Sequence, residues 1–409
     1  MEKYDLAVVG AGPAGSMAAY QAAKLGLKVL LLEEHGQAGS PPHCAGKLSV
    51  KAFQEFSLPS QCILNGVRGA LFHSPGNLEI EVSKPNPESY IIDRELFDRR
   101  LAEEAINAGA EAVFKCKVRQ VGFHPGGGLT VKGSSLEVKV PVLIIAEGGA
   151  RRLARSLGFQ GLPVLKGIQA EMEDVNLERE DFVEVFFGWK FFPSFFGWLI
   201  PVGEGKARIG LCVRGDMAEM SPRAYLEKML REYPPLKGRV GKAWIGRVYG
   251  GLIPVEGPVK KMWHPKGIMA VGDAAGHAKS TTGGGVLFGL KAGRLAGEAA
   301  SRLAETGRVE EALRGYQQAC LKAFGGELSF TRRARRFLNR LSDGELDQFF
   351  RFLSAHRSLL KVAEGRGDTA YQSKVWKPLL KASARLVFEK PSTLKFAGRI
   401  LWRLLQSMV

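Results

Sequence analysis

The sequence predicts an α/β fold, and three observations lead to this prediction. An apolar run at residues 4–9 is followed at once by glycines and an Ala-rich stretch, which is the pattern of a β-α-β unit. Residues 160–255 consist of short alternating stretches crowded with aromatic side chains, as in a mixed sheet. The chain beyond residue 308 has the periodicity of helices. We therefore expect an α/β domain, an inserted sheet domain and a helical C-terminal region.

Each element of the α/β domain has its own signal. Residues 4–9 and 28–32 are expected to form strands, because both are apolar, and the Ala-rich residues 14–25 a helix between them. Asp93 is a candidate N-cap, because its short carboxylate can accept hydrogen bonds from the free N–H groups of a helix start. The further elements expected are a helix from this cap to about residue 108, a hairpin formed by residues 115–123 and 129–131, buried strands at 142–146 and 267–271, and a long helix at 284–304.

The composition is that of a globular protein with more than one domain. The chain has 409 residues, of which 45% are hydrophobic and 24% are charged. Its five cysteines have no Cys-x-x-Cys spacing, which argues against a zinc site or a disulfide framework. The first residues suggest a strand rather than a signal peptide, and no apolar run is long enough to span a membrane. A cytoplasmic location is therefore expected.

The positive charge is unevenly distributed. The net charge is +17, and residues 331–409 carry 17 Lys and Arg against 6 Asp and Glu, a net charge of +11. Such a tail suits anionic lipid, nucleic acid or an acidic partner, or is a solvated helical face. Residues 391–409 mix apolar and basic side chains at a spacing typical of an interfacial helix, although packing against the protein is an alternative. We expect peripheral contact with the inner face of the cell membrane.

A glycine fingerprint follows the first strand. Gly10, Gly12 and Gly15, with Ala14 between the last two, match the turn that lets a backbone approach a pyrophosphate at a helix N-terminus. Glu33 ends the second strand, 23 positions after Gly10, where an acidic side chain accepts hydrogen bonds from ribose hydroxyls. The pattern predicts a Rossmann-type dinucleotide-binding domain.

A second motif indicates FAD as the dinucleotide. Residues 270–277 and 281–285 form a strand, a Gly-Asp pair, a Gly-rich loop and a helix start, which resembles the flavin-binding segment of the aromatic-hydroxylase superfamily. The resemblance implies that Asp273 bonds a ribityl hydroxyl. It also implies further FAD contacts from the following residues: Arg94 of an Asp-Arg helix start, Val118 on the adenine side, and Gly284, Gly285 and Val286 at the start of the last helix. In the family's Ala-Asp-Gly stretch, this chain has Glu147 in place of Asp.

Residues 41–49 resemble the signature of the geranylgeranyl reductase family. That signature is Pro-x-x-Cys-x-Gly-x-x-Ser, and all its fixed residues are present as Pro41, Cys44, Gly46 and Ser49. The resemblance extends over roughly residues 1–330. It implies an FAD-dependent reductase that saturates C=C bonds of an isoprenoid chain on a membrane lipid or a quinone.

A second motif of the same family, Tyr-x-Trp-x-Phe-Pro, is matched in part. Trp198 and Pro201 agree, whereas Phe196 and Ile200 differ, so the Tyr hydroxyl is lost. Phe196, Trp198 and Pro201 are implied to contact the substrate. The aromatic cluster at residues 186–198 is expected to line an apolar tunnel, with an aromatic core stripe as the alternative.

Cys44 is the candidate catalytic residue, and with Ala45 it is expected near the flavin ring. Reduction of a C=C bond needs a hydride on one carbon and a proton on the other, and a free thiol, with a pKa of about 8.5, carries such a proton at neutral pH. Cys44 either donates this proton or only shapes the pocket. His43 and His277 are alternative proton sources.

Other functions remain open from sequence alone. Phe196-x-Trp198-x-Ile200-Pro201 partly resembles the Trp-x-Trp-x-Ile-Pro motif of flavin-dependent halogenases, so a monooxygenase or halogenase is one alternative. A quinone-linked electron-transfer flavoprotein is another, although no iron–sulfur ligand set is visible. A basic nucleic-acid-binding protein has only the charged tail in its favour. No second glycine fingerprint indicates an NAD(P)H domain, so NADPH or a ferredoxin-type protein is expected to deliver electrons by docking.

These observations divide the chain into three expected regions. Residues 1–155 and 256–305 form the Rossmann-type FAD-binding domain, with some strands of the substrate domain at residues 60–90. Residues 156–255 form the inserted mixed β-sheet substrate domain. Residues 306–409 form the basic C-terminal helical region.

Overall fold

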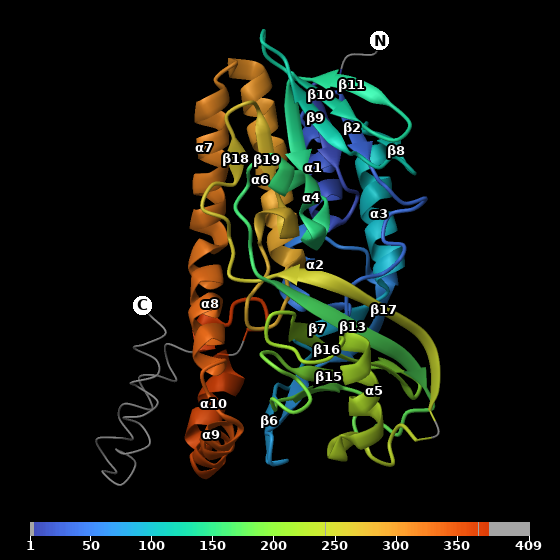
Figure 1. Ribbon diagram of the computed structural model, residues 1–409, viewed down its shortest axis with the longest axis vertical. Helices are drawn as coiled ribbons and strands as arrows, with labels where there is room; N and C mark the ends of the chain where they lie inside the picture. Colours follow the sequence, from blue (N-terminus) through green and yellow to red (C-terminus); the bar gives the residue numbers. More distant parts are fainter. Residues whose placement is uncertain (1–3, 242, 367, 376–409) are drawn as a thin grey trace, which may run out of the picture. The chain divides into compact units, whose positions relative to one another are not determined.

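The computed structural model describes residues 4–241, 243–366 and 368–375, and the chain divides into two compact units. The first unit contains Met1–His43, Asp93–Val164 and Leu252–Ser329, and the second contains Cys44–Ile92, Leu165–Gly251 and Phe330–Val409. Both units are therefore built from three separate stretches of the chain, and their boundaries differ from the three regions expected above. Figure 1 shows the elements of both units, many of them labelled.

The first unit is built on a six-stranded sheet. Its central strand β1 (Leu6–Val9) pairs in parallel with β12 (Val142–Ile145) and with β2 (Val29–Leu32). The full order is β18-β19-β12-β1-β2-β8, with β18 at Trp263–His264, β19 at Ile268–Ala270 and β8 at Glu111–Val113. Every residue of β1, β2, β12 and β19 is buried, which is why these strands are continuous apolar runs in the sequence. The predicted buried parallel strands are confirmed.

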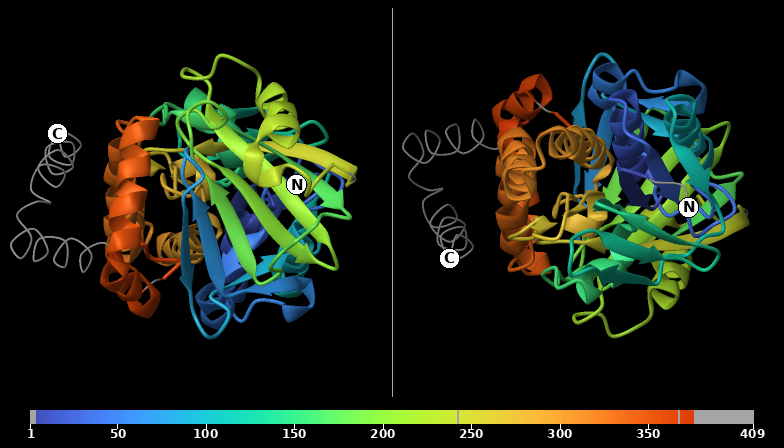
Figure 2. Two further views of the ribbon diagram at one scale, coloured as in Figure 1. Left: turned by 90° about the horizontal axis from the view of Figure 1, so that it is seen from below. Right: turned by 90° about the horizontal axis from the view of Figure 1, so that it is seen from above.

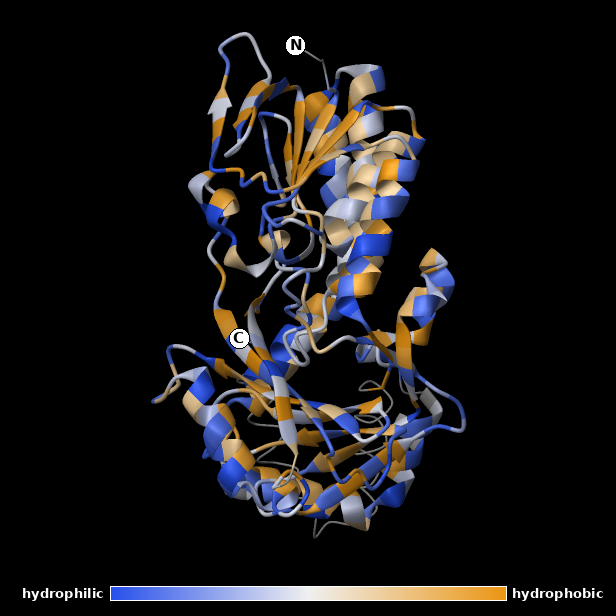
Figure 3. Cartoon of the chain, turned by 90° about the vertical axis from the view of Figure 1, so that its right-hand side faces the viewer, coloured by the Kyte–Doolittle hydropathy of each residue, from blue (hydrophilic) through white to orange (hydrophobic). Residues whose placement is uncertain are grey.

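Three helices of this unit pack together beside the sheet. Helix α1 (Pro13–Lys24) contacts both α3 (Arg94–Asn107) and α6 (Val286–Thr306), and Figure 3 shows the helices gathered on one side of the apolar strands. Helix α6 can approach α1 closely because Gly293 and Gly297 have no side chains. A Cβ on Gly293 would overlap the carbonyl oxygen of Ala14, and one on Gly297 would lie 2.8 Å from the carbonyl oxygen of Ala18. Glycines at these two positions thus set the distance between the helices.

The predicted cap and hairpin of this unit are confirmed, with one change of boundary. Asp93 accepts hydrogen bonds from the backbone N–H groups of Glu95 and Leu96, at 2.9 and 3.0 Å. The hairpin pairs β9 (Gln120–Phe123) with β10 (Leu129–Lys132), and β11 (Glu137–Val140) completes a small antiparallel sheet. The first hairpin strand begins at Gln120 rather than at residue 115, because Lys115 has a φ of 57°, which no strand can contain.

The second unit is built on a seven-stranded mixed sheet of order β17-β13-β16-β15-β14-β5-β6. Strands β14 and β5 pair in parallel, and the neighbouring pairs β5–β6, β14–β15, β15–β16 and β13–β16 are antiparallel. The strands are β5 (Gly69–His73), β6 (Glu79–Ser83), β13 (Val164–Glu173), β14 (Phe182–Phe186), β15 (Gly197–Gly203), β16 (Lys206–Arg214) and β17 (Trp244–Pro254). The mixed sheet is as expected. A smaller sheet contains β3 (Lys47–Ser49), β7 (Ser89–Ile92) and β4 (Ile63–Val67), and α2 (Val50–Phe56) follows β3.

The aromatic cluster belongs largely to the core of this unit. Phe186, Phe191 and Phe192 are buried and surround the ring of Tyr233, with centroid separations of 5.1, 5.1 and 5.2 Å. Helix α5 (Pro222–Glu232) covers this cluster and contacts β16, and the left view of Figure 2 shows α5 lying over the strands of the sheet. For these three phenylalanines the structure supports the core stripe rather than the tunnel.

The C-terminal part of the described chain is helical, as expected. Helix α7 (Val309–Cys320) continues through a π-helical turn into α8 (Gly326–Leu338), and α9 (Asp343–Ala355) and α10 (Arg357–Arg366) follow. Residues 391–409, the predicted interfacial helix, lie outside the described residues.

Among the described residues, no helix combines the length and the apolar character needed to cross a bilayer.

Replacing Gly293 tests the close contact between α1 and α6. We expect Gly293→Ala to lower the free energy of unfolding by about 1–3 kcal/mol, because the added methyl group meets the Ala14 backbone and overpacks the contact. The matched control is Gly315→Ala in α7, where nothing lies within 4 Å of the new Cβ; helix propensity alone should then raise stability by about 0.5–1 kcal/mol. Urea denaturation measures both variants, and equal effects of the two substitutions would contradict the proposed contact.

Candidate functional site

The start of α1 has the geometry of a phosphate-binding turn. Gly10 has a φ of 103°, and a Cβ there would overlap the carbonyl oxygen of Ala146; a Cβ on Gly15 would overlap the carbonyl oxygen of Gly10. At Gly12, by contrast, nothing lies within 4 Å of the Cβ position, so the backbone is open to a ligand. No side chain caps the first turn of α1, which leaves its N–H groups available. These residues fit the pyrophosphate of a dinucleotide.

Glu33 is held in place directly after β2. Its Oε2 accepts a hydrogen bond from the backbone N–H of Ala11 at 2.8 Å, and its Oε1 accepts one from the N–H of His35 at 2.9 Å. The side chain is almost fully buried, so its orientation is restricted. Oε1 also lies 2.8 Å from Nδ1 of His35, whereas Oε2 retains a lone pair to which a ribose hydroxyl can donate.

The two flavin-type motifs meet in the first unit although some 260 residues separate them. A Cβ on Gly272 would lie 2.9 Å from the Cβ of Ala14, so the loop of the second motif lies against the first turn of α1. Asp273 stands in a short 3-10 helix, Gly272–Ala275, and the Cβ position of Gly285 is 3.0 Å from its Oδ1. Gly284 and Gly285 precede α6, which begins at Val286 without a side-chain cap. Two uncapped helix starts thus belong to one unit.

Burial controls the protonation of Asp273. Removal from water raises the pKa of its carboxyl to about 6, although the charges of Arg94 and Arg151 favour the ionised form. A carboxyl with this pKa can accept or donate a hydrogen bond near neutral pH, and both suit a polyol such as a ribityl chain.

Arg94 and Val118 lie in the same unit as these motifs. Arg94 begins α3 and forms a bidentate pair with Asp98, with Nε–Oδ1 and Nη2–Oδ2 distances of 3.0 and 2.9 Å. Burial raises the pKa of Asp98, and the guanidinium of Arg94 opposes this effect. Val118 is half-buried between β8 and β9. Their contacts with FAD stay predictions.

Arg151 supports the Asp273 loop, and the sequence analysis missed it. Its side chain is buried, and it donates from Nε to the carbonyl oxygen of Ala274 at 3.0 Å and from Nη2 to that of Gln160 at 2.7 Å. Glu147, which replaces the family's Asp, accepts from the N–H groups of Leu153 and Ala154 at 2.9 and 2.6 Å. Glu147 therefore serves the start of α4 (Arg152–Ser156), and no local pattern marks Arg151 in the sequence.

His277 is poorly suited to donate a proton. The side chain is fully buried, its ring lies 5.0 Å from that of Phe324, and neither ring nitrogen has a hydrogen-bond partner among the residues that the structure describes. Burial lowers the pKa of His277 to about 3, so the imidazole is neutral at physiological pH. His277 therefore lacks the acidic form that a proton donor needs.

In the second unit, the signature residues around Cys44 have identifiable local roles. Cys44 is partly exposed, and its Sγ accepts a hydrogen bond from the N–H of Gly46 at 3.4 Å. Gly46 has a φ of 78°, and a Cβ there would overlap Nη1 of Arg208 and lie 2.6 Å from the carbonyl oxygen of Ile92. Ser49 caps α2 by accepting from the N–H of Ala52 at 3.3 Å. Gly46 and Ser49 thus shape the chain around Cys44.

The predicted substrate residues lie on or beside β15. Phe196 stacks on Phe195 at a centroid distance of 4.3 Å and lies edge-on to Trp198 at 6.1 Å. Trp198 and Ala45 pack against one apolar cluster that includes Val67, Ile91, Val183 and Ile200. Pro201 is buried, and its carbonyl oxygen accepts from Asn65 at 3.2 Å. The structure therefore brings Ala45 and Trp198 together, and their contact with a substrate stays a prediction.

Comparison with known proteins places this architecture among reductases. Residues 5–364 match the family model described as lycopene cyclase protein. Digeranylgeranylglycerophospholipid reductase 2 of Methanothermobacter thermautotrophicus is 33% identical over 411 residues, which cover 98% of this chain and all of that relative. The protein of the same name from Methanopyrus kandleri is 31% identical, again over 98% of this chain and all of the relative.

Solved structures agree in fold. A geranylgeranyl bacteriochlorophyll reductase-like protein from Thermoplasma acidophilum is 26% identical and superimposes with a TM-score of 0.82, over 98% of this chain and 100% of that chain. The flavin-dependent brominase Bmp2 is 17% identical with a TM-score of 0.70, over 95% of this chain and 100% of that chain, which shows a shared fold alone. The chain belongs to the family that the matched model describes and, with its full-length relatives, to the geranylgeranyl reductase family.

Proposed function

We propose that this chain is an FAD-dependent reductase that saturates C=C bonds in the geranylgeranyl chains of a membrane lipid or a quinone. The observation that supports this proposal best is the assembly of both glycine motifs, Glu33 and Asp273 within one unit, in a chain whose full-length relatives are named reductases of isoprenoid lipids. The halogenase alternative has only a shared fold and the partial motif match at residues 196–201 in its favour.

The first unit supplies the residues that would hold FAD. The turn at Gly10, Gly12, Ala14 and Gly15 would receive the pyrophosphate, and Glu33 would accept from the ribose. The remaining FAD contacts would come from Arg94, Val118, Asp273, Gly284, Gly285 and Val286. Bound in its reduced form, FAD would supply the hydride for one carbon of the double bond.

Cys44 would supply the proton for the other carbon. The S–H bond breaks as the new C–H bond forms, and the resulting thiolate recovers a proton from water. With the hydride, the alkene thus gains two hydrogens and two electrons. Cys44 suits this role because it is partly exposed, whereas Cys62, Cys116, Cys212 and Cys320 are buried. Burial also raises the pKa of Cys212 and of Cys320 to about 12, so these thiols are poorer acids.

The electron donor and the membrane are the partners of this proposal. The net charge of +17 suits an acidic ferredoxin-type protein electrostatically, and NADPH is the alternative donor. An isoprenoid lipid lies in a bilayer, so the enzyme must reach the membrane surface, and a basic protein is attracted to anionic lipid.

Replacing Cys44 tests its role as proton donor. We expect Cys44→Ala to lower the turnover number about 100-fold or more, because a positioned general acid contributes 10²–10⁴-fold. The dithionite-reduced protein is mixed anaerobically with a geranylgeranylated glycerophospholipid, flavin reoxidation is followed by absorbance, and mass spectrometry detects lipid that gains two mass units per bond. The control Cys62→Ala should keep its turnover. Unchanged turnover in Cys44→Ala with normal flavin content would exclude the proton role.

Replacing Asp273 should stabilise the apoprotein and weaken the binding of FAD. Its folded-state pKa, about 6, is above the ordinary 3.8, so its contribution to stability is most favourable below pH 3.8 and is lost as the pH rises through 6. We expect Asp273→Asn to raise the free energy of unfolding of the apoprotein by about 3 kcal/mol at pH 8 and by less at pH 5, since the amide carries no buried charge. The same variant should bind FAD more weakly. Urea denaturation and flavin titration measure these effects, and equal stabilisation at both pH values would contradict the prediction.

Truncation tests the membrane contact. We expect removal of residues 391–409 to lower binding to vesicles that contain anionic lipid, because each basic residue near such a surface contributes about 1 kcal/mol. Cosedimentation with anionic vesicles gives the bound fraction, and neutral vesicles are the control. Undiminished binding by a truncated protein with an unchanged melting temperature would assign the membrane contact to another surface.

A further inference from the structure

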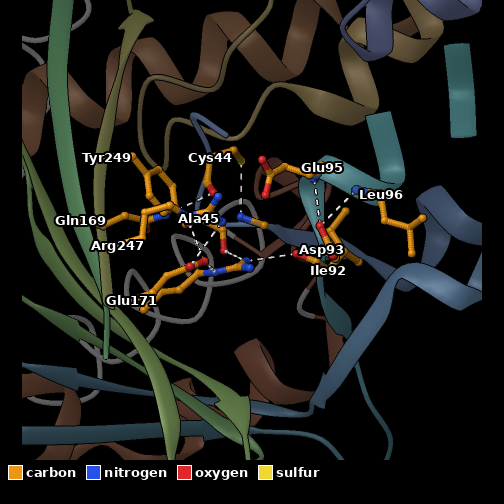
Figure 4. A network of polar contacts seen from close by, with 12 residues as sticks. Cys44, Ala45, Ile92, Asp93, Glu95, Leu96, Gln169, Glu171, Arg247 and Tyr249 are labelled. Carbon is orange, nitrogen blue, oxygen red and sulfur yellow. Dashed lines mark hydrogen bonds and ion pairs between the residues drawn. The ribbon is translucent and has the colours of Figure 1, made fainter. Parts of the chain in front are cut away.

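Two neighbouring strands of the second unit hold the backbone around Cys44 with polar side chains (Figure 4). Gln169 of β13 donates from Nε2 to the carbonyl oxygen of Cys44 at 3.2 Å. Arg208 of β16 donates from Nη1 to the carbonyl oxygens of Ala45 and Ile92, each at 3.0 Å. Two successive carbonyl groups, those of Cys44 and Ala45, are thus each bound by a side chain from the sheet.

Arg208 is itself fixed by its surroundings. It is buried, and its Nε donates to Oε1 of Glu171 at 3.1 Å; Glu171 is the residue directly opposite it on β13. The hydroxyl of Tyr249 donates to the same oxygen at 2.9 Å, and Arg247 lies 3.3 Å from the other one. Burial raises the pKa of Tyr249 well above its ordinary value, so this donor stays protonated. Hydrogen bonds from a charged, immobilised guanidinium are among the stronger ones in proteins.

Trp198 determines which way the amide of Gln169 faces. Its Nε1 donates to Oε1 of Gln169 at 3.2 Å, and an indole N–H can only donate. The amide oxygen must therefore face Trp198, which leaves the NH₂ group for the carbonyl oxygen of Cys44. The family's aromatic motif and Cys44 are thereby joined through one side chain.

Glycine at position 210 makes this connection geometrically feasible. Trp198, Gly210 and Gln169 are paired in one row across β15, β16 and β13. A Cβ on Gly210 would overlap the Cβ of Gln169 and lie 2.7 Å from Cζ2 of Trp198. Without a side chain in the middle of the row, the indole reaches across the central strand to Gln169.

We infer that Gln169 and Arg208 are positioning residues that hold the Cys44 segment, residues 44–46, against the sheet and thereby set the place of the Cys44 thiol, with Trp198 orienting Gln169. This inference rests on the proposed role of Cys44. The physical reason is that a proton can be delivered to one carbon of an alkene only from a defined position. Without hydrogen bonds to the carbonyl groups of Cys44 and Ala45, the segment would adopt more positions. Each hydrogen bond that is lost lowers the free energy needed to move the segment away from the sheet.

Labelling of Cys44 by iodoacetamide measures the segment directly, without substrate. We expect Gln169→Leu and Trp198→Phe to raise the rate of Cys44 alkylation about fivefold, the effect of losing one hydrogen bond. Arg208→Lys keeps the charge beside Glu171 but cannot make all three hydrogen bonds, and should raise the rate at least as much. The matched control is Glu173→Gln, also on β13, whose carboxylate pairs only at the surface with Lys206 at 3.3 Å; its rate should equal that of the native protein. Peptide mass spectrometry identifies the labelled cysteine.

The four buried cysteines separate positioning from general loosening of the fold. With a positioning role, Cys44 alone is labelled faster, and Cys62, Cys116, Cys212 and Cys320 remain slow. An unchanged or lower rate for Cys44, or a rate that rises together with that of Cys212, would overturn the inference.

In turnover assays, the Gln169 variant should lose kcat with little change in KM. If Cys44→Ala retains full turnover, the proposed function of Cys44 fails, whereas the labelling result still decides whether the sheet holds the segment.

Discussion

The contact between α1 and α6 is the constraint on which the first unit depends. Gly293 has no side chain that would overlap the Ala14 backbone, so the backbones of the two helices come into close contact. This approach brings the loop that precedes α6 against the first turn of α1, and Ala14 then meets Gly272. In the proposed FAD site, residues far apart in sequence lie side by side because this helix pair has no bulky side chain between its members.

The second unit solves a different problem, which is to place polar groups on a sheet whose interior is apolar. Gln169 and Arg208 are buried, and Glu171 is half-buried; burying such groups singly is costly, because each polar atom loses its water. Together they satisfy one another and the carbonyl groups of the Cys44 segment, so that the cost is largely offset. A network of this kind restricts the segment to one position, as the proposed role of Cys44 requires.

The distant likeness to a halogenase shows why fold alone does not identify the reaction. A brominase with a similar fold shares 17% of its residues with this chain, and the shared architecture supports several chemistries. In this chain, glycines at positions 46 and 210 leave room for Arg208 and Trp198 beside the segment at Cys44. The relatives that are 31% and 33% identical over their full lengths place the chain among the reductases.

The sequence by itself determined the local features of this protein. The glycine turn at Gly10, the cap at Asp93 and the buried strands were predictable because each depends on residues within a few positions of one another. Only the tertiary structure decided the strand order, the parallel pairing of residues 69–73 with 182–186, and the roles of Gln169, Arg151 and Arg208. These depend on pairings between residues more than 100 positions apart, which arise when strands align and side chains pack, and no local pattern encodes them.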